Sequence, residues 1–247
     1  MPPPTLTRLF PDITRGHASG DIRAICLDID DTLVDYLASG RAGLAALIGS
    51  DRAWAQWAEH TELHYDRFLA GEVDFDTMRL QRTKAFFAER GEVLSDAEAV
   101  LREARRMEAM RGAWRLFDDA LPCLHLLRSA GLLLAAITNA PSKHQRSKLA
   151  TVGLIDTFDV LVIAEEVGMA KPDPAIFHLA CKRLGVRPHQ TVHVGDRLDL
   201  DAQAAVDAGL RGVWLDRCRT ALVAPRGVHV INGLLELPDL LAALPAA

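Results

Sequence analysis

Two aspartates after a short apolar stretch have the spacing that paired nucleophile and acid chemistry needs. Residues 22–29 are largely apolar, and Asp28 and Asp30 stand at their end with one residue between them. Because side chains alternate in direction along a strand, carboxylates at positions i and i+2 point to the same side. One can attack an electrophile while the other exchanges protons, so the pair is a candidate catalytic centre. Asp31 and Thr32 also suit a turn or a helix cap, so this segment alone leaves a structural interpretation open.

A second and a third polar cluster follow later apolar stretches and offer hydrogen-bond donors. Thr138 and Asn139 end the second stretch, and Lys171 follows the third. A threonine hydroxyl and the backbone amides at a helix start can cradle a phosphate group, although a Thr-Asn pair also commonly caps a helix. The ring of Pro172 restricts the backbone of Lys171, which sets it apart from an ordinary surface lysine. These donors indicate a site for an anion.

Three aspartates, Asp196, Asp199 and Asp201, lie close together after the fourth apolar stretch. Carboxylates at this spacing repel one another, and a bound cation lowers that cost. Because the candidate ligand atoms are all oxygens, we expect Mg²⁺ rather than zinc. Acidic residues are also favoured at a helix start, which accounts for Asp199 and Asp201 better than for Asp196.

The apolar stretches themselves predict a parallel sheet. They span 22–29, 132–138, 159–164, 191–195 and 212–215 and lack a polar alternate face, as strands covered on both sides do. Helical patterns separate the last four, so we predict an α/β fold with a doubly wound, Rossmann-like parallel sheet. Ligands of such sheets gather at the carboxyl ends of the strands, where all the polar clusters stand.

The interval 36–115 interrupts this alternation, because it contains several helical patterns and no strand pattern. We therefore predict an inserted helical domain at 36–115, a catalytic core formed by 21–35 and 116–247, and a loose tail at 1–20. Four arginines in the insertion are expected to form a solvated face: Arg102, Arg105, Arg106 and Arg111.

Composition and charge narrow the classes of partner. The net charge of -5 gives no global positive field for nucleic acid or an anionic membrane. The apolar runs are shorter than the roughly 20 residues that cross a bilayer, so we predict no membrane insertion. The four cysteines lack a metal-ligand spacing, which favours a reducing cytoplasm. We expect a cytoplasmic monomer or homodimer.

In their order along the chain, the four clusters resemble the motifs of the haloacid dehalogenase-like hydrolase superfamily. The residues that carry the resemblance are Asp28, Asp30, Thr138, Lys171 and Asp196 through Asp201. The resemblance extends from residue 22 to about residue 243, and the helical insertion is similar to the cap domain of the first type in that superfamily. In the first motif of that superfamily, glycine is commoner at the position that Asp31 occupies here. The choice between Asp199 and Asp201 as the second acid of the last motif stays open.

The resemblance implies a Mg²⁺-dependent phosphatase acting on a small phosphorylated metabolite. Asp28 would attack phosphorus to form an aspartyl-phosphate, and Asp30 would protonate the leaving group and then activate water. The implied phosphate-binding residues are Thr138, Asn139 and Lys171, the last also counted as catalytic. The implied metal ligands are Asp28, the backbone carbonyl of Asp30, Asp196 and Asp201, and the cap would choose the substrate.

Three other activities and one non-catalytic role compete with this interpretation. A dehalogenase of the superfamily needs neither Asp30 nor Mg²⁺, a phosphonate hydrolase would use a cap lysine, here Lys84, and a phosphosugar mutase shares all four motifs. A non-catalytic phosphate-binding regulator could keep the fold without the chemistry. Sugar phosphates, nucleoside monophosphates and short phospho-acids all remain open as substrates.

Overall fold

A computed structural model describes residues 22–220 and 222–244 of the chain. The chain divides into two compact units. The core unit runs up to Val34 and resumes at Leu116, and the helical unit is Asp35–Arg115. The tail predicted at residues 1–20 lies outside the described residues.

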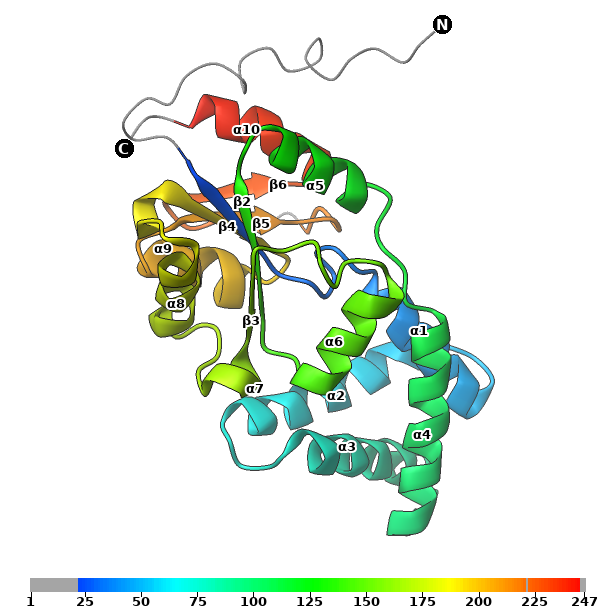
Figure 1. The fold of residues 1–247 in the computed structure, drawn as a ribbon. Helices are drawn as coiled ribbons and strands as arrows, with labels where there is room; N and C mark the ends of the chain where they lie inside the picture. Colours follow the sequence, from blue (N-terminus) through cyan, green and yellow to red (C-terminus); the bar gives the residue numbers. More distant parts are fainter. Residues whose placement is uncertain (1–21, 221, 245–247) are drawn as a thin grey trace, which may run out of the picture. The chain divides into compact units, whose positions relative to one another are not determined.

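The core unit is built on a parallel sheet, which has six strands in the described residues (Figure 1). Their order is β3-β2-β1-β4-β5-β6, and every neighbouring pair is parallel. The bounds are β1 Ala24–Leu27, β2 Leu133–Thr138, β3 Val160–Ile163, β4 Thr191–Gly195, β5 Arg211–Leu215 and β6 Val228–Ile231. The chain leaves β1 toward β2 and β3 and returns to add β4, β5 and β6 on the other side. The carboxyl ends of β1 and β4 therefore meet at the point where the strand order reverses.

The predicted fold class is confirmed, and the five predicted strands correspond to β1 through β5. The sixth, β6, was not predicted. It lies at the edge of the sheet, and Val230 on it is 45% exposed. An edge strand buries too little to show a continuous apolar pattern, and His229 interrupts the short Val-His-Val-Ile segment.

Helices cover both faces of the sheet (Figure 1). One face packs on α5 (Ala120–Ser129), α6 (Ser142–Thr151) and α10 (Leu237–Ala243), and the other packs on α8 (Pro174–Leu184) and α9 (Ala204–Asp207). The short elements are α7 Ala164–Val167, η2 Pro188–Gln190, η3 Leu198–Gln203 and η4 Leu234–Glu236. Both faces of the sheet are thus apolar and buried, as the unbroken apolar stretches require. Among the described helices, none is long and apolar enough to cross a membrane.

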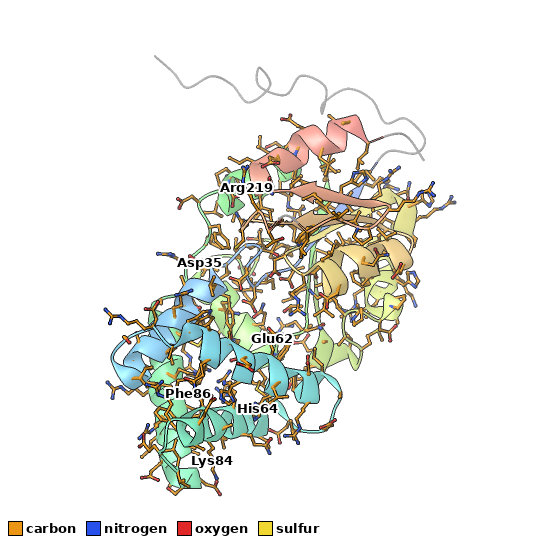
Figure 2. The ribbon with its side chains drawn as sticks, turned by 180° about the vertical axis from the view of Figure 1, so that it is seen from behind. Asp35, Glu62, His64, Lys84, Phe86 and Arg219 are labelled. Atoms are coloured by element: carbon orange, nitrogen blue, oxygen red, sulfur yellow. The ribbon has the colours of Figure 1, made fainter. Side chains whose placement is uncertain are left out.

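The helical unit consists of four helices around its own apolar core. They are α1 Tyr36–Ile48, α2 Trp54–Leu69, α3 Phe75–Glu89 and α4 Asp96–Gly112. Phe86 lies inside this unit (Figure 2) and packs edge-to-face on Trp57, with ring centroids 5.0 Å apart. Gly43 lets α1 approach α4, because a Cβ at that position would lie 2.6 Å from Met110 Cγ. The unit therefore has a close-packed interior of its own.

A charged cluster is buried beside this aromatic core. Glu103 accepts hydrogen bonds from Arg82 and Arg106 at 3.0 Å, and all three side chains are at most 5% exposed. Both guanidinium groups also lie over the ring of Trp57. Burial alone would raise the pKa of Glu103, but the two arginines more than offset it and lower the pKa to about 2. The expectation that Arg106 is solvated is therefore wrong, because the charge of Arg106 is compensated inside the helical unit.

We predict that Glu103→Gln destabilises the helical unit by roughly 3–5 kcal/mol, because it leaves two buried guanidinium groups without a counter-charge. Urea unfolding followed by circular dichroism measures the change. Since the folded pKa of Glu103 lies below its ordinary value of 4.5, the stabilisation is complete above that value and is lost as pH falls through about 2. Glu92→Gln, which breaks the more exposed pair with Arg102, should leave the midpoint nearly unchanged. Equal effects of the two substitutions would contradict this account.

Candidate active site

The ammonium group of Lys171 lies between two buried carboxylates, that of Asp28 directly after β1 and that of Asp201 on η3, which follows β4. Its Nζ donates to Asp28 Oδ1 and to Asp201 Oδ1, both at 2.6 Å. The three side chains are at most 9% exposed. Burial by itself lowers the pKa of Lys171, but the charges of Asp201 and Asp28 reverse this and hold the pKa above its ordinary value. Three residues far apart in the sequence thus form one compact cluster of charges.

Asp196 joins this cluster and makes it crowded with negative charge. One oxygen each from Asp28, Asp196 and Asp201 lies within 4.8 Å of the others. Burial raises the pKa of Asp28 to about 7, although Lys171 lowers it in part. Burial, with the charges of Asp28 and Asp201 adding to it, raises the pKa of Asp196 to about 9. Oxygen ligands at this spacing that repel one another could hold a divalent cation, which would offset the repulsion.

Asp201 is fixed by contacts on both of its oxygens. Oδ1 also contacts His193 Nε2 at 3.0 Å, and Oδ2 accepts the Arg197 backbone amide at 3.1 Å. Burial would raise the pKa of Asp201, but Lys171 and the hydrogen bond from His193 outweigh it and hold the pKa below its ordinary value. Gly195 leaves the space for this side chain, because a Cβ there would lie 2.2 Å from Asp201 Cγ. The buried aspartate is therefore held as a carboxylate in one position.

The geometry separates the two candidates for the second acid of the last cluster. Asp201 lies in the buried cluster, whereas Asp199 is exposed and pairs with Arg197 at 3.2 Å. Both residues belong to η3, a π-type turn directly after β4. Asp196 precedes this turn, and its carbonyl accepts a hydrogen bond from Trp214 Nε1 at 2.9 Å. The turn thus directs Asp201 inward and leaves Asp199 in solvent.

Thr138 and Asn139 lie at the carboxyl end of β2, and Asn139 joins them to Lys171. Asn139 Nδ2 donates to the Lys171 carbonyl and Asn139 Oδ1 accepts from the Lys171 amide, both at 2.8 Å. This pair of bonds fixes the backbone of Lys171 against the end of β2. The side chain of Asn139 therefore orients the lysine, a contact that sequence reasoning did not predict.

Asp30 lies in a tight turn after β1. The Asp31 backbone amide donates a hydrogen bond to the Val34 carbonyl at 2.8 Å, and the φ angle of Asp31 is 56°. That left-handed conformation favours glycine, and aspartate is among the other residues that adopt it. The turn explains why glycine is common at this position in the resembling motif and why Asp31 is a tolerable replacement.

Sequence reasoning missed Lys148, which contacts the side chain of Asp30, and Gln145, which contacts Lys148. Lys148 on α6 forms an ion pair with Asp30 Oδ1 and donates to Gln145 Oε1 at 2.9 Å. Both Lys148 and Gln145 are fully buried. The sequence places them with Leu149 on one helix face, at i, i+3 and i+4, and polar residues on a helix face are more typical of solvent exposure.

Comparison with known proteins agrees with this geometry. A family model described as haloacid dehalogenase-like hydrolase matches residues 22–209. The chain is 32% identical over 224 residues to phosphoserine phosphatase of Thermus thermophilus, covering 79% of this chain and 89% of the relative. It is 29% identical over 246 residues to N-acylneuraminate-9-phosphatase of Mus musculus, covering 90% and 95%. The solved structure of HAD-hydrolase YfnB from Bacillus subtilis, bound to magnesium, is similar in fold, with a TM-score of 0.78, 24% identity and 90% and 99% coverage.

We predict that Gly195→Ala destabilises the core unit by about 1–3 kcal/mol, because the new methyl group overlaps the Asp201 side chain and forces it to move. Thermal unfolding measures the loss. Gly112→Ala is the matched control, since nothing lies within 4 Å of a Cβ at that position, and it should not lower the melting temperature. If both variants have the same melting temperature as the parent, the Asp201 side chain is not confined as described.

Proposed function

Because the chain belongs to the haloacid dehalogenase-like hydrolase family, we propose that it is a Mg²⁺-dependent phosphatase that forms an aspartyl-phosphate on Asp28. Relatives named as phosphatases cover most of the chain, which supports a small phosphate monoester as the substrate. The contact of Lys171 with both Asp28 and Asp201 at 2.6 Å supports this role most directly. A cation fixed beside a nucleophilic carboxylate can meet the charge of an incoming phosphate.

In the first step, a carboxylate oxygen of Asp28 bonds to phosphorus and the bond from phosphorus to the ester oxygen breaks. Asp30 gives its proton to the departing alkoxide. In the second step, Asp30 takes a proton from water, the water oxygen bonds to phosphorus, and Asp28 is released with inorganic phosphate. Each proton transfer reverses the other, so Asp30 ends the cycle as it began.

The remaining residues bind and orient the phosphate. We assign the Thr138 hydroxyl, the Asn139 amide and the Lys171 ammonium as donors to its non-reacting oxygens. Mg²⁺ would be held by Asp28, the Asp30 carbonyl and Asp196, with Asp201 supporting. When bound, the ion would neutralise charge on the phosphate and on the crowded carboxylates. We further propose that the helical unit selects the leaving group.

Two alternatives within the family lose support from particular residues. A dehalogenase has no use for Asp30, which here is held in an ion pair. A phosphonate hydrolase would need Lys84 as an amine nucleophile, yet Lys84 of the helical unit (Figure 2) pairs with Asp96 at 2.7 Å and its side chain is 40% exposed. An amine nucleophile is normally activated by desolvation, and Lys84 lacks that environment.

We expect phosphate release from 4-nitrophenyl phosphate in the presence of Mg²⁺ and its loss after chelation with EDTA. Asp28→Asn should lower turnover by at least about 1,000-fold, because an amide cannot replace the attacking carboxylate. Phosphate release is followed by a colorimetric assay, with protein folding checked by circular dichroism.

Asp199→Asn is the matched control, since Asp199 is exposed, and it should retain the parent rate. Unchanged turnover in Asp28→Asn would remove Asp28 as the nucleophile. Absence of release by the parent from this ester and from a panel of phosphorylated metabolites would contradict the proposed hydrolysis; the panel includes phosphoserine and N-acylneuraminate 9-phosphate. Isomerisation of a sugar phosphate without phosphate release would identify a mutase instead.

A further inference from the structure

Lys148 is a lysine with no exposed surface on its side chain. Burying an ammonium group costs several kcal/mol unless charged and polar partners compensate it. Lys148 lies on α6, the helix that follows Thr138, and the apolar neighbour Leu149 packs into the core of the sheet. Its position therefore requires specific partners, and these partners belong to the proposed catalytic site.

The first partner is the carboxylate of Asp30. Lys148 Nζ contacts Asp30 Oδ1, although the two residues are 118 positions apart in the chain. The Asp30 side chain is 26% exposed, so it is held at the edge of the site rather than sealed inside it. An ion pair through one oxygen fixes the direction in which the carboxylate presents its other oxygen.

The second partner connects Lys148 to Thr138. Lysine has no acceptor, so Gln145 must present its Oε1 to Lys148 Nζ, at 2.9 Å. This orientation turns Gln145 Nε2 toward Thr138 Oγ1, to which it donates at 3.2 Å. The Ala140 amide donates to the same oxygen, also at 3.2 Å. With both lone pairs of the hydroxyl occupied, its hydrogen is left to point at a ligand.

We propose that Lys148 is a positioning residue, an inference that rests on the proposed function. It orients the Asp30 carboxylate for proton transfer and, through Gln145, the Thr138 hydroxyl for phosphate binding. The same ammonium group thereby couples the acid/base residue of the turn after β1 to the phosphate donor at the end of β2. Lys148 itself touches neither the ester nor the phosphate in this role.

The dependence of rate on the leaving group distinguishes this role from a structural one. Phenyl phosphate has a poor leaving group that needs protonation, whereas 2,4-dinitrophenyl phosphate releases a stable anion with little help. In Lys148→Met, kcat/KM should fall at least about tenfold for phenyl phosphate and much less for the dinitrophenyl ester, since proton transfer by a positioned side chain contributes about 100-fold or more. Lys143→Met, an exposed lysine on the same helix, should leave both values unchanged.

A double-variant cycle tests whether Lys148 acts through Asp30. In an Asp30→Asn background, the further loss that Lys148→Met causes on phenyl phosphate should shrink to the small loss seen with the dinitrophenyl ester, because only the effect on Thr138 is left. Losses that multiply, equal losses on the two esters, or full activity of Lys148→Met would each overturn the inference.

Melting temperatures show whether each variant folds. We expect Lys148→Met to fold, because methionine fills the space of the aliphatic stem and the partly exposed Asp30 can be hydrated. Should it not fold, Lys148→Arg serves the same comparison, since it keeps the charge but moves the donor, and the selective loss on phenyl phosphate is again expected. If the parent releases no phosphate from either ester with Mg²⁺ present, the proposed function fails. If the parent is active but the Lys148 variants show no selective loss on phenyl phosphate, only the inference about Lys148 fails.

Discussion

The ion contacts of Lys171 are the constraint on which the rest of the core unit depends. An ammonium group buried to this degree is stable only between carboxylates, and Asp28 and Asp201 provide them at 2.6 Å. Asp28 directly follows β1, and Asp201 lies on η3 after β4. The two strands are neighbours in the sheet although residues 28–190 separate them in the chain. The parallel register, the π-type turn of η3 and the missing side chain at Gly195 all serve to bring these charges together.

The sheet and the four polar clusters could be predicted because both depend on local pattern and on a general rule. Buried parallel strands show as unbroken apolar stretches, and the polar residues that follow each one must share an edge of the sheet. This rule makes Asp28, Thr138, Lys171 and Asp196 candidates for the site. β6 was missed because an edge strand lacks that signal, with Val230 exposed on it.

Contacts among charged side chains could not be predicted, because burial of a charge is decided by tertiary partners. The pattern around Lys148 and Gln145 is typical of a solvated helix face, whereas the ion pair with Asp30, 118 positions away in the chain, helps to compensate the buried charge of Lys148. Arg106 shows the same effect in the helical unit, where Glu103 compensates it. His193 is buried, and its contact with Asp201 at 3.0 Å depends on how η3 folds back on β4.

Asp31 shows how backbone and electrostatic requirements can conflict at such a site. Its φ of 56° lies in the left-handed region, which glycine adopts most easily and which aspartate adopts more often than most other residues. Yet its charge also raises the pKa of Asp196, so it adds repulsion to a cluster in which Lys171 already compensates Asp28 and Asp201. Asp31 therefore adds negative charge beside Asp196, and a cation bound there would offset it.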